Sequence, residues 1–174
     1  FRYNITLDTV CDYNRYQRVI AVAGLEVDLK QLPAGDRTEI GERGITLSGG
    51  QKARLALARA LYLHPECDLF LLDDVLSALD VGVATHVFNA CVRELLQHHT
   101  RVLVLNSHLH FLQHCDTVVV MEGGQIVASG TYSDLLDRYR HILLPSHTAV
   151  KQRTQSMSSE GGHVSPFPSP KIFA

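Results

Sequence analysis

The chain has 174 residues, which is enough for one domain with its own hydrophobic core. Hydrophobic residues make up 45% of it, charged residues 20%, and the formal net charge is -2. This balance gives no reason to expect a nucleic-acid partner or an anionic membrane surface. No run approaches the roughly 18 apolar residues of a membrane-spanning helix. The four cysteines form no CxxC pair, so a zinc site is not indicated.

The first third of the chain shows helical periodicity interrupted by glycine and proline. Apolar residues recur at helical spacing over 13–32, and Gly24 divides this segment into two short helices. A turn at 33–36 leads into a polar, glycine-containing loop over 36–47. An apolar stripe then predicts a long helix over 49–63.

From residue 68 onward, predicted strands alternate with helices, which indicates an α/β fold with a mainly parallel sheet flanked by helices. The first strand, 68–73, is an apolar run ending in acid, the pattern of a strand buried on both faces of a parallel sheet. The further predicted elements are a helix over 83–95, strands over 102–105 and 117–121, a hairpin through Gly123 and Gly124, and a closing helix over 131–144.

The last thirty residues differ in composition from the rest. Four of the six prolines lie in 145–174, together with several serines. Such a segment buries too little apolar surface to offset its ordering entropy. The sequence therefore predicts a domain over 1–144 followed by a flexible linker over 145–174.

The chemistry is most concentrated where the long helix begins, at Ser48, Gly49, Gly50 and Gln51. A helix N-terminus presents unpaired backbone N–H groups and a partial positive charge. Two glycines allow an anion to approach that backbone closely, and Ser48 adds a hydroxyl donor. The motif therefore predicts a phosphate-binding turn. On its own, it is also compatible with a serine N-cap followed by flexible glycines.

Together with four further segments, this motif resembles the nucleotide-binding domain of ABC transporters. The resemblance covers about 1–144 and implies a P-loop NTPase-like ABC ATPase domain with a helical signature subdomain. The matching segments are the signature motif at 47–51, the signature helix at 53–61, a Walker B strand at 71–74, a D-loop at 77–80 and a switch-histidine loop at 107–108.

The resemblance implies a role for each acid and for the histidine. Asp73 would hold Mg²⁺ at the carboxyl edge of the sheet, although a strand-end acid alone would more often cap a turn. Asp74 stands where strongly hydrolytic members carry glutamate, so its carboxylate would orient the attacking water with roughly 1.5 Å less reach. This indicates a weakened site. His108 would contact the γ-phosphate, whereas a lone histidine there would more often be structural.

Domains of this family pair head to tail. Ser48 to Gln51 would therefore bind the ATP of a second nucleotide-binding domain, and Asp80 would lie at the dimer seam. The family's GxxxxGK[ST] phosphate loop occurs nowhere in the 174 residues. We therefore expect the chain to be the C-terminal portion of such a domain, and to bind ATP only weakly by itself.

Two features indicate the subfamily. The segment Thr38 to Gly44 resembles the loop with which ABC exporters contact the coupling helices of their membrane domains. The run 71–80, with aspartate after the Walker B acid, resembles the first nucleotide-binding domain of the multidrug-resistance-associated (C) subfamily. An additional two residues near 65–67, and Asn106 before Ser107 and His108, depart from the usual family pattern.

The implied function is coupling of ATP binding and hydrolysis to export, at the cytosolic face of a membrane and without nucleic acid. Two alternatives stay open. Asp74 leaves room for a regulatory nucleotide-binding module of an ABC-type channel or receptor. A soluble ABC-type ATPase acting on DNA or ribosomes is less favoured, because such proteins usually lack the exporter loop. We further expect Gly50→Asp to block the partner's site and leave the fold intact.

Overall fold

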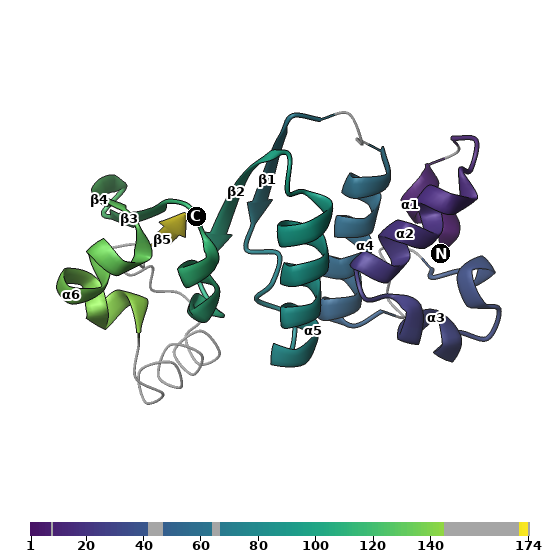
Figure 1. The fold of residues 1–174 in the computed structure, drawn as a ribbon. Coiled ribbons are helices and arrows are strands. Elements are labelled where there is room, and N and C mark those ends of the chain that lie inside the picture. Colours follow the sequence, from purple (N-terminus) through teal and green to yellow (C-terminus); the bar gives the residue numbers. More distant parts are fainter. Residues whose placement is uncertain (8, 42–46, 64–66, 145–170, 174) are drawn as a thin grey trace. The chain divides into compact units, whose positions relative to one another are not determined.

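The computed structural model describes residues 1–7, 9–41, 47–63, 67–144 and 171–173. It divides into two compact units, Phe1–Val102 and Leu103–Ala174 (Figure 1). Among the residues described, no helix has both the length and the apolarity to cross a membrane. Each unit is presented by itself below.

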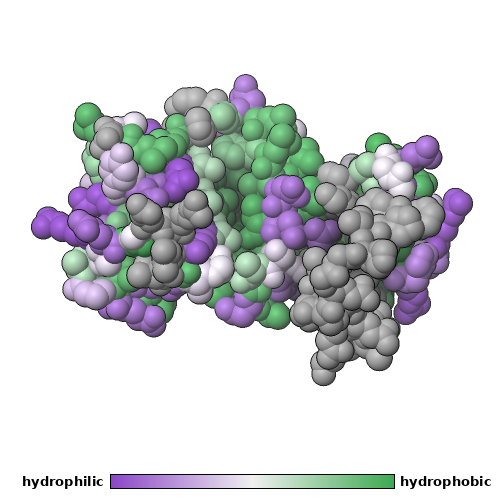
Figure 2. All heavy atoms as spheres, turned by 180° about the vertical axis from the view of Figure 1, so that it is seen from behind, coloured by the Kyte–Doolittle hydropathy of each residue, from purple (hydrophilic) through white to green (hydrophobic). Residues whose placement is uncertain are grey.

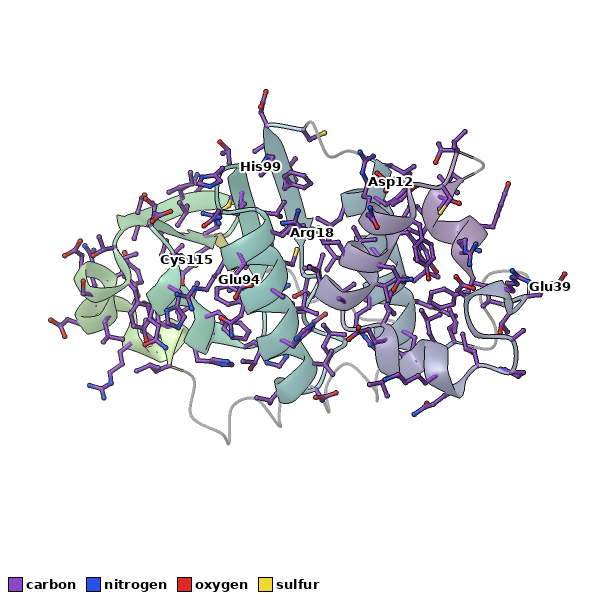
Figure 3. The ribbon with its side chains drawn as sticks, turned by 45° about the vertical axis from the view of Figure 1, so that its right-hand side comes forward. Asp12, Arg18, Glu39, Glu94, His99 and Cys115 are labelled. Atoms are coloured by element: carbon purple, nitrogen blue, oxygen red, sulfur yellow. The ribbon has the colours of Figure 1, made fainter. Side chains whose placement is uncertain are left out.

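The first unit begins with short helices. Asp12 caps the second of them by accepting the N–H of Arg15 at 3.1 Å, and Figure 3 shows it at the helix start. Gly24 has a φ of 66°, a conformation that glycine adopts without strain, and it separates two helices as predicted. The elements are α1 (Arg2–Thr6), α2 (Tyr13–Val22), α3 (Glu26–Gln31) and the 3₁₀ helix η1 (Gly35–Arg37).

Helix α4 (Gly49–Leu63) is the support on which these helices pack. It matches the predicted helix at both ends. Its apolar face buries Leu55, Ala58 and Leu61, and α1 and α2 pack against the helix. Each such leucine contributes roughly 1.5–3 kcal/mol through its burial. This packing fixes the direction of α4 and, with it, the position of residues 48–51 at its beginning.

A strand, a helical segment and a second strand follow: β1 (Leu69–Asp73), α5 (Val81–Val87), the π-helix η3 (Phe88–Leu95) and β2 (Thr100–Leu105). The Thr100 N–H donates to the Asp68 carbonyl at 2.9 Å where the strands run side by side. The helix predicted over 83–95 is confirmed in extent. Its second half has π geometry, in which the Leu96 N–H reaches the Cys91 carbonyl at 3.0 Å.

The prediction that β1 is buried on both faces is wrong. Phe70 and Leu72 are buried, but Leu69 is 50% exposed and Leu71 is 70% exposed. A strand is covered on both sides only where a layer packs against each face. Helices lie against one face of β1 in Figure 1, and Figure 2 shows hydrophobic residues gathered in the middle of the view from behind, where β1 lies.

In the second unit, β2 ends and the 3₁₀ helix η4 (Leu109–His114) leads into the predicted hairpin. Strands β3 (Val118–Glu122) and β4 (Gln125–Gly130) pair antiparallel. Gly123 and Gly124 have φ values of 56° and 79°, as a tight hairpin turn requires. Thr131 caps α6 (Tyr132–Leu143) in a capping box with Asp134. The alternation of strands and helices from β1 to α6 confirms the predicted α/β fold, but β3 pairs antiparallel with both of its neighbours and not in the parallel manner expected for most of the sheet.

One element was not predicted. Residues 171–173, at the end of the segment expected to be a linker, form strand β5 (Lys171–Phe173). It pairs antiparallel with both β2 and β3, so that Ile172 stands opposite Leu105 and Val120. Residues 145–170, the rest of that segment, lie outside the described residues.

Candidate functional site

Ser48 and Gln51 form a capping box at the start of α4. The Ser48 N–H donates to Gln51 Oε1 at 2.8 Å, and the Gln51 N–H donates to Ser48 Oγ at 3.2 Å. The S-x-x-Q spacing is the pattern for this arrangement. We refer to residues 48–51 as the signature turn. The N-cap that the sequence allowed as an alternative is therefore present, and it defines the geometry in which a ligand would meet this turn.

The capping box uses the Gln51 amide and leaves the amides of Gly49 and Gly50 outside its hydrogen bonds. An α-helix provides no intrahelical acceptor for its first N–H groups, which here include those of Gly49 and Gly50. A Cβ built on Gly49 would have no described atom within 4 Å. Ser48 and Gly49 are both exposed. The turn thus offers a hydroxyl, two amide donors and the positive end of a helix dipole to an anion approaching from the Gly49 side.

Gly50 faces the protein instead. A Cβ on Gly50 would lie 2.9 Å from the carbonyl oxygen of Ala78, closer than real Cβ atoms approach backbone. The signature turn therefore packs directly against the loop that follows β1. The structure therefore argues against the expectation that Gly50→Asp leaves the fold intact, because any side chain at this position has to displace the backbone at Ala78.

Asp73 and Asp74 lie where β1 ends. Asp73 is exposed, and Asp74 is partly buried with a φ of 53°. Aspartate tolerates this left-handed conformation better than most residues. The Asp74 carbonyl accepts the Ser77 N–H at 3.3 Å and the Ser77 hydroxyl at 3.0 Å. The chain thus turns tightly after the strand, with two carboxylates at the turn.

These carboxylates fit the chemistry of Mg²⁺. No group of three or more His, Cys, Asp and Glu side chains suited to a metal occurs in the described part of the chain. Mg²⁺ is usually held by one or two carboxylates together with water and the phosphate oxygens of a nucleotide. Asp73, the expected Mg²⁺ ligand, has the chemistry of the protein carboxylate in such a donor set.

Asp80 has a structural role that sequence reasoning missed. Its Oδ1 accepts the Val83 N–H at 3.0 Å, which makes it the N-cap of α5. Aspartate is among the preferred residues at this position. The side chain is exposed, so the cap leaves its other oxygen facing solvent.

A single loop connects these groups. It begins at Asp74, makes the turn closed by Ser77, touches the signature turn at Ala78 and ends at the cap Asp80. The structure therefore brings the acid pair, the signature turn and Asp80 into one neighbourhood of the first unit.

His108 belongs to the second unit. It has a φ of 53° and a ψ of 36°, and its carbonyl accepts the Phe111 N–H at 3.0 Å where η4 begins. Its partly buried ring lies 6.0 Å from that of His110, centroid to centroid. Burial, followed by the charges of His108 and His114, lowers the pKa of His110. The turn after β2 therefore presents a histidine cluster in which protonation of His110 is disfavoured.

The predicted exporter loop is described in part. Ile40 is buried, whereas Glu39 is exposed and projects away from the helices in Figure 3. Residues 42–46 lie outside the described residues, and so do 64–66, where the sequence indicates additional length.

Sequence reasoning also missed Asp28 and Arg54. Asp28 lies on α3 and is only 8% exposed. It accepts the Gln51 side-chain N–H at 2.9 Å and an Arg54 N–H at 2.6 Å. An aspartate in a short helical segment resembles an ordinary exposed acid in the sequence, so no local pattern identifies this contact.

A hollow of about 420 Å³ lies elsewhere in the first unit. Arg15 and Arg18 of α2, Phe70 of β1 and His99 line it, and Figure 3 labels Arg18 and His99. None of the site residues predicted from the sequence contributes to its wall.

Comparison with known proteins agrees with the motifs. A family model described as ABC transporter matches residues 6–77, which include the signature turn and both acids. The chain belongs to the ABC transporter family. The matched segment includes Gly50 and ends one residue before Ala78, whose carbonyl oxygen Gly50 approaches.

Proteins similar to this chain include members of the C subfamily of ABC transporters and a multidrug resistance protein. The chain is 48% identical over 139 residues to ABC transporter C family member 7 of Dictyostelium discoideum, covering 79% of the chain and 10% of that protein. It is 48% identical over 137 residues to mouse ATP-binding cassette sub-family C member 2, covering 78% and 9%. It is 43% identical over 163 residues to multidrug resistance protein mrp-7 of Caenorhabditis elegans, covering 92% and 10%.

This ABC transporter chain spans about a tenth of the length of the relatives it matches. Within it, the signature turn, Asp73, Asp74 and Asp80 lie in the first unit, and His108 lies in the second. The resemblance stated from the motifs is thereby confirmed at the level of family and subfamily.

Proposed function

We propose that this chain is the C-terminal part of the ATP-binding and ATP-hydrolysing domain of an exporter of the C subfamily. It corresponds to the first of two nucleotide-binding domains in one polypeptide, at the cytosolic face of a membrane. The family match, the C-subfamily relatives and the aspartate that follows the Walker B acid support this proposal. ATP binding and hydrolysis by the domain pair drive export, and no step involves nucleic acid.

The observation that carries the proposal is the exposed first turn of α4. Ser48 Oγ and the amides of Gly49 and Gly50 contact the ATP of the partner domain, and Gly49 leaves the space through which a phosphate approaches. Gln51 contributes from behind the turn, through its hydrogen bond to Ser48. Asp80 lies at the seam between the two domains and caps α5 as it does so.

Asp73, Asp74 and His108 serve the ATP of this domain. Asp73 would hold Mg²⁺, which would supply charge neutralisation at the phosphate oxygens. Asp74 accepts a hydrogen bond from the attacking water and orients it, and His108 contacts the γ-phosphate. The loop over residues 38–44 meets the coupling helices of the membrane domains and transmits the change to them.

A second candidate is a regulatory module of an ABC-type channel or receptor with little hydrolysis. The favouring observation is Asp74, whose shorter carboxylate stands on a left-handed residue at the strand end. A carboxylate that lies about 1 Å too far from the attacking water lowers the hydrolysis rate about a hundredfold.

Hydrolysis by the complete protein separates the two candidates. An exporter hydrolyses ATP continuously, and His108→Ala reduces this rate at the domain's own site at least about tenfold, as loss of a group in contact with the transferred phosphate should. A regulatory module binds ATP but hardly hydrolyses it, so the rate of the unsubstituted protein would equal that of its His108→Ala variant. Gln113→Ala, on the 3₁₀ helix that follows His108, serves as the control that leaves hydrolysis unchanged.

A further inference from the structure

The side chain of Gln51 is engaged at both ends. Its amide oxygen accepts the Ser48 N–H at 2.8 Å, and its amide nitrogen donates to Asp28 Oδ1 at 2.9 Å. Gln51 therefore links the backbone of the signature turn to a buried carboxylate on α3.

Asp28 determines which end of the amide faces which partner. An ionised carboxylate only accepts hydrogen bonds, so it selects the NH₂ group of Gln51. The amide oxygen is then left facing Ser48, which has an N–H to donate. With the amide reversed, two donors would meet at Ser48 and two acceptors at Asp28. The carboxylate thus enforces the one orientation that completes the capping box.

Arg54 supplies the counter-charge that stabilises this buried carboxylate. Asp28 is 8% exposed, and a charge buried to that degree requires a partner. The guanidinium of Arg54 donates to Asp28 Oδ2 at 2.6 Å and to Oδ1 at 3.3 Å, and it also bonds the Gly24 carbonyl at the break between α2 and α3. The pair ties two helices to α4 one turn behind the signature turn.

We propose that Asp28 is a positioning residue for ATP binding at the signature turn. By fixing the Gln51 amide, it holds the Ser48 backbone in place, and with it the Ser48 hydroxyl and the glycine amides. This inference rests on the proposed function, since it deepens the role assigned there to residues 48–51. It also makes Gln51 a support of the turn, whose amide is already committed to Ser48 and Asp28.

An exchange of the two functional groups tests the contact without changing side-chain shape at residue 28. Gln51→Glu places a carboxylate opposite Asp28, and both then compete for Arg54. Asp28→Asn removes the charge that selects the amide orientation. The double variant Asp28→Asn/Gln51→Glu again places one amide opposite one carboxylate, so it should restore what each single change removes.

The first measurement is amide hydrogen exchange at Ser48 in the 174-residue chain. Asp28→Asn and Gln51→Glu should each accelerate it about fivefold, the effect of losing one typical hydrogen bond, and the double variant should return it toward the original rate. Asp36→Asn is the matched control. Asp36 forms an ion pair with Arg2 of α1, at 2.5 Å, and not with a residue of α4. This variant should leave Ser48 exchange unchanged. Unchanged exchange in both single variants would overturn the inference.

The second measurement is ATP use at the two sites of the complete transporter. Asp28→Asn should raise the ATP concentration for half-maximal occupancy at the partner's site about fivefold, leave this domain's own site unchanged, and be rescued in the double variant. An equal loss at both sites would indicate general destabilisation and overturn the inference.

Ser48→Ala distinguishes a failure of this inference from a failure of the proposed function. If it weakens the partner's site and Asp28→Asn does not, the positioning role fails; if Ser48→Ala has no effect there, the proposed function fails.

Discussion

Gly50 and Ala78 lie so close that a Cβ on Gly50 would come within 2.9 Å of the Ala78 carbonyl oxygen. The two residues are far apart in the sequence and belong to the first turn of α4 and to the loop after β1. Their close approach places the turn proposed to bind the partner's ATP directly against the loop that follows the acid pair. This packing offers a physical route between the two proposed sites.

The adjacent glycines should respond differently to the same change. Gly50→Ala should destabilise the 174-residue chain by about 1–2 kcal/mol, because overpacking outweighs the better helix propensity of alanine. Gly49→Ala should be neutral or slightly stabilising, since no described atom lies within 4 Å of its Cβ. Urea unfolding of both variants measures this. Equal stabilities would show that the Ala78 backbone yields without cost.

The helix-capping role of Asp80 should be separable from any role of its negative charge. Asp80→Ala removes the acceptor for the Val83 N–H and should cost about 1 kcal/mol of unfolding free energy. Asp80→Asn keeps an equally good capping oxygen, so the chain should retain most of its stability. If the carboxylate also acts at the domain seam, Asp80→Asn should still weaken coupling between the two ATP sites of the complete transporter. Full coupling in that variant would confine Asp80 to its capping role.

Asp74 sets the hydrolysis rate of this domain's own site in the proposed function. Asp74→Glu should raise single-turnover hydrolysis there or leave it undiminished, because the added methylene extends the carboxylate by roughly 1.5 Å. Asp74→Asn is the control that tolerates the same left-handed backbone but lacks the charge, and it should lower the rate. A rate that falls with glutamate and is unchanged with asparagine would exclude Asp74 from the reaction.

The cysteines should differ sharply in reactivity. Burial raises the pKa of the Cys91 thiol to about 12, whereas Cys11 is exposed. Since the thiolate is the reactive form, a fraction on the order of 10⁻⁴ of Cys91 would be reactive at pH 8. Iodoacetamide should therefore modify Cys11 in the folded chain and Cys91 only after urea unfolding, as read by peptide mass spectrometry. Comparable rates in the folded chain would mean that the helix carrying Cys91 opens readily.

Much of the fold follows from local patterns. The apolar stripe predicted α4 at both ends, and Gly24 and the pair Gly123–Gly124 predicted breaks where their positive φ values occur. Such features depend on neighbouring residues alone, which is why the sequence is informative about them.

The remaining features depend on contacts between distant segments. The approach of Gly50 to Ala78, the bond from Gln51 to Asp28 and the pairing of β5 leave no periodic signal. The exposed face of β1 was predicted wrongly for the same reason, because an apolar run shows that a face suits burial and says nothing about what covers it. For the candidate site, the sequence predicted which residues form it. It did not predict the contacts with distant residues that hold them in place.

The central claim is that the signature turn serves the ATP of the partner domain. Gly49→Asp tests it most directly, because the new carboxylate has room, suits a helix N-terminus and repels a phosphate by roughly 4 kcal/mol at 4 Å and an intermediate dielectric. Single-turnover hydrolysis at each site of the complete transporter is the measurement. We predict loss of ATP binding and hydrolysis at the partner's site, with this domain's own site retained. Loss at its own site, with the partner's site spared, would contradict the head-to-tail arrangement.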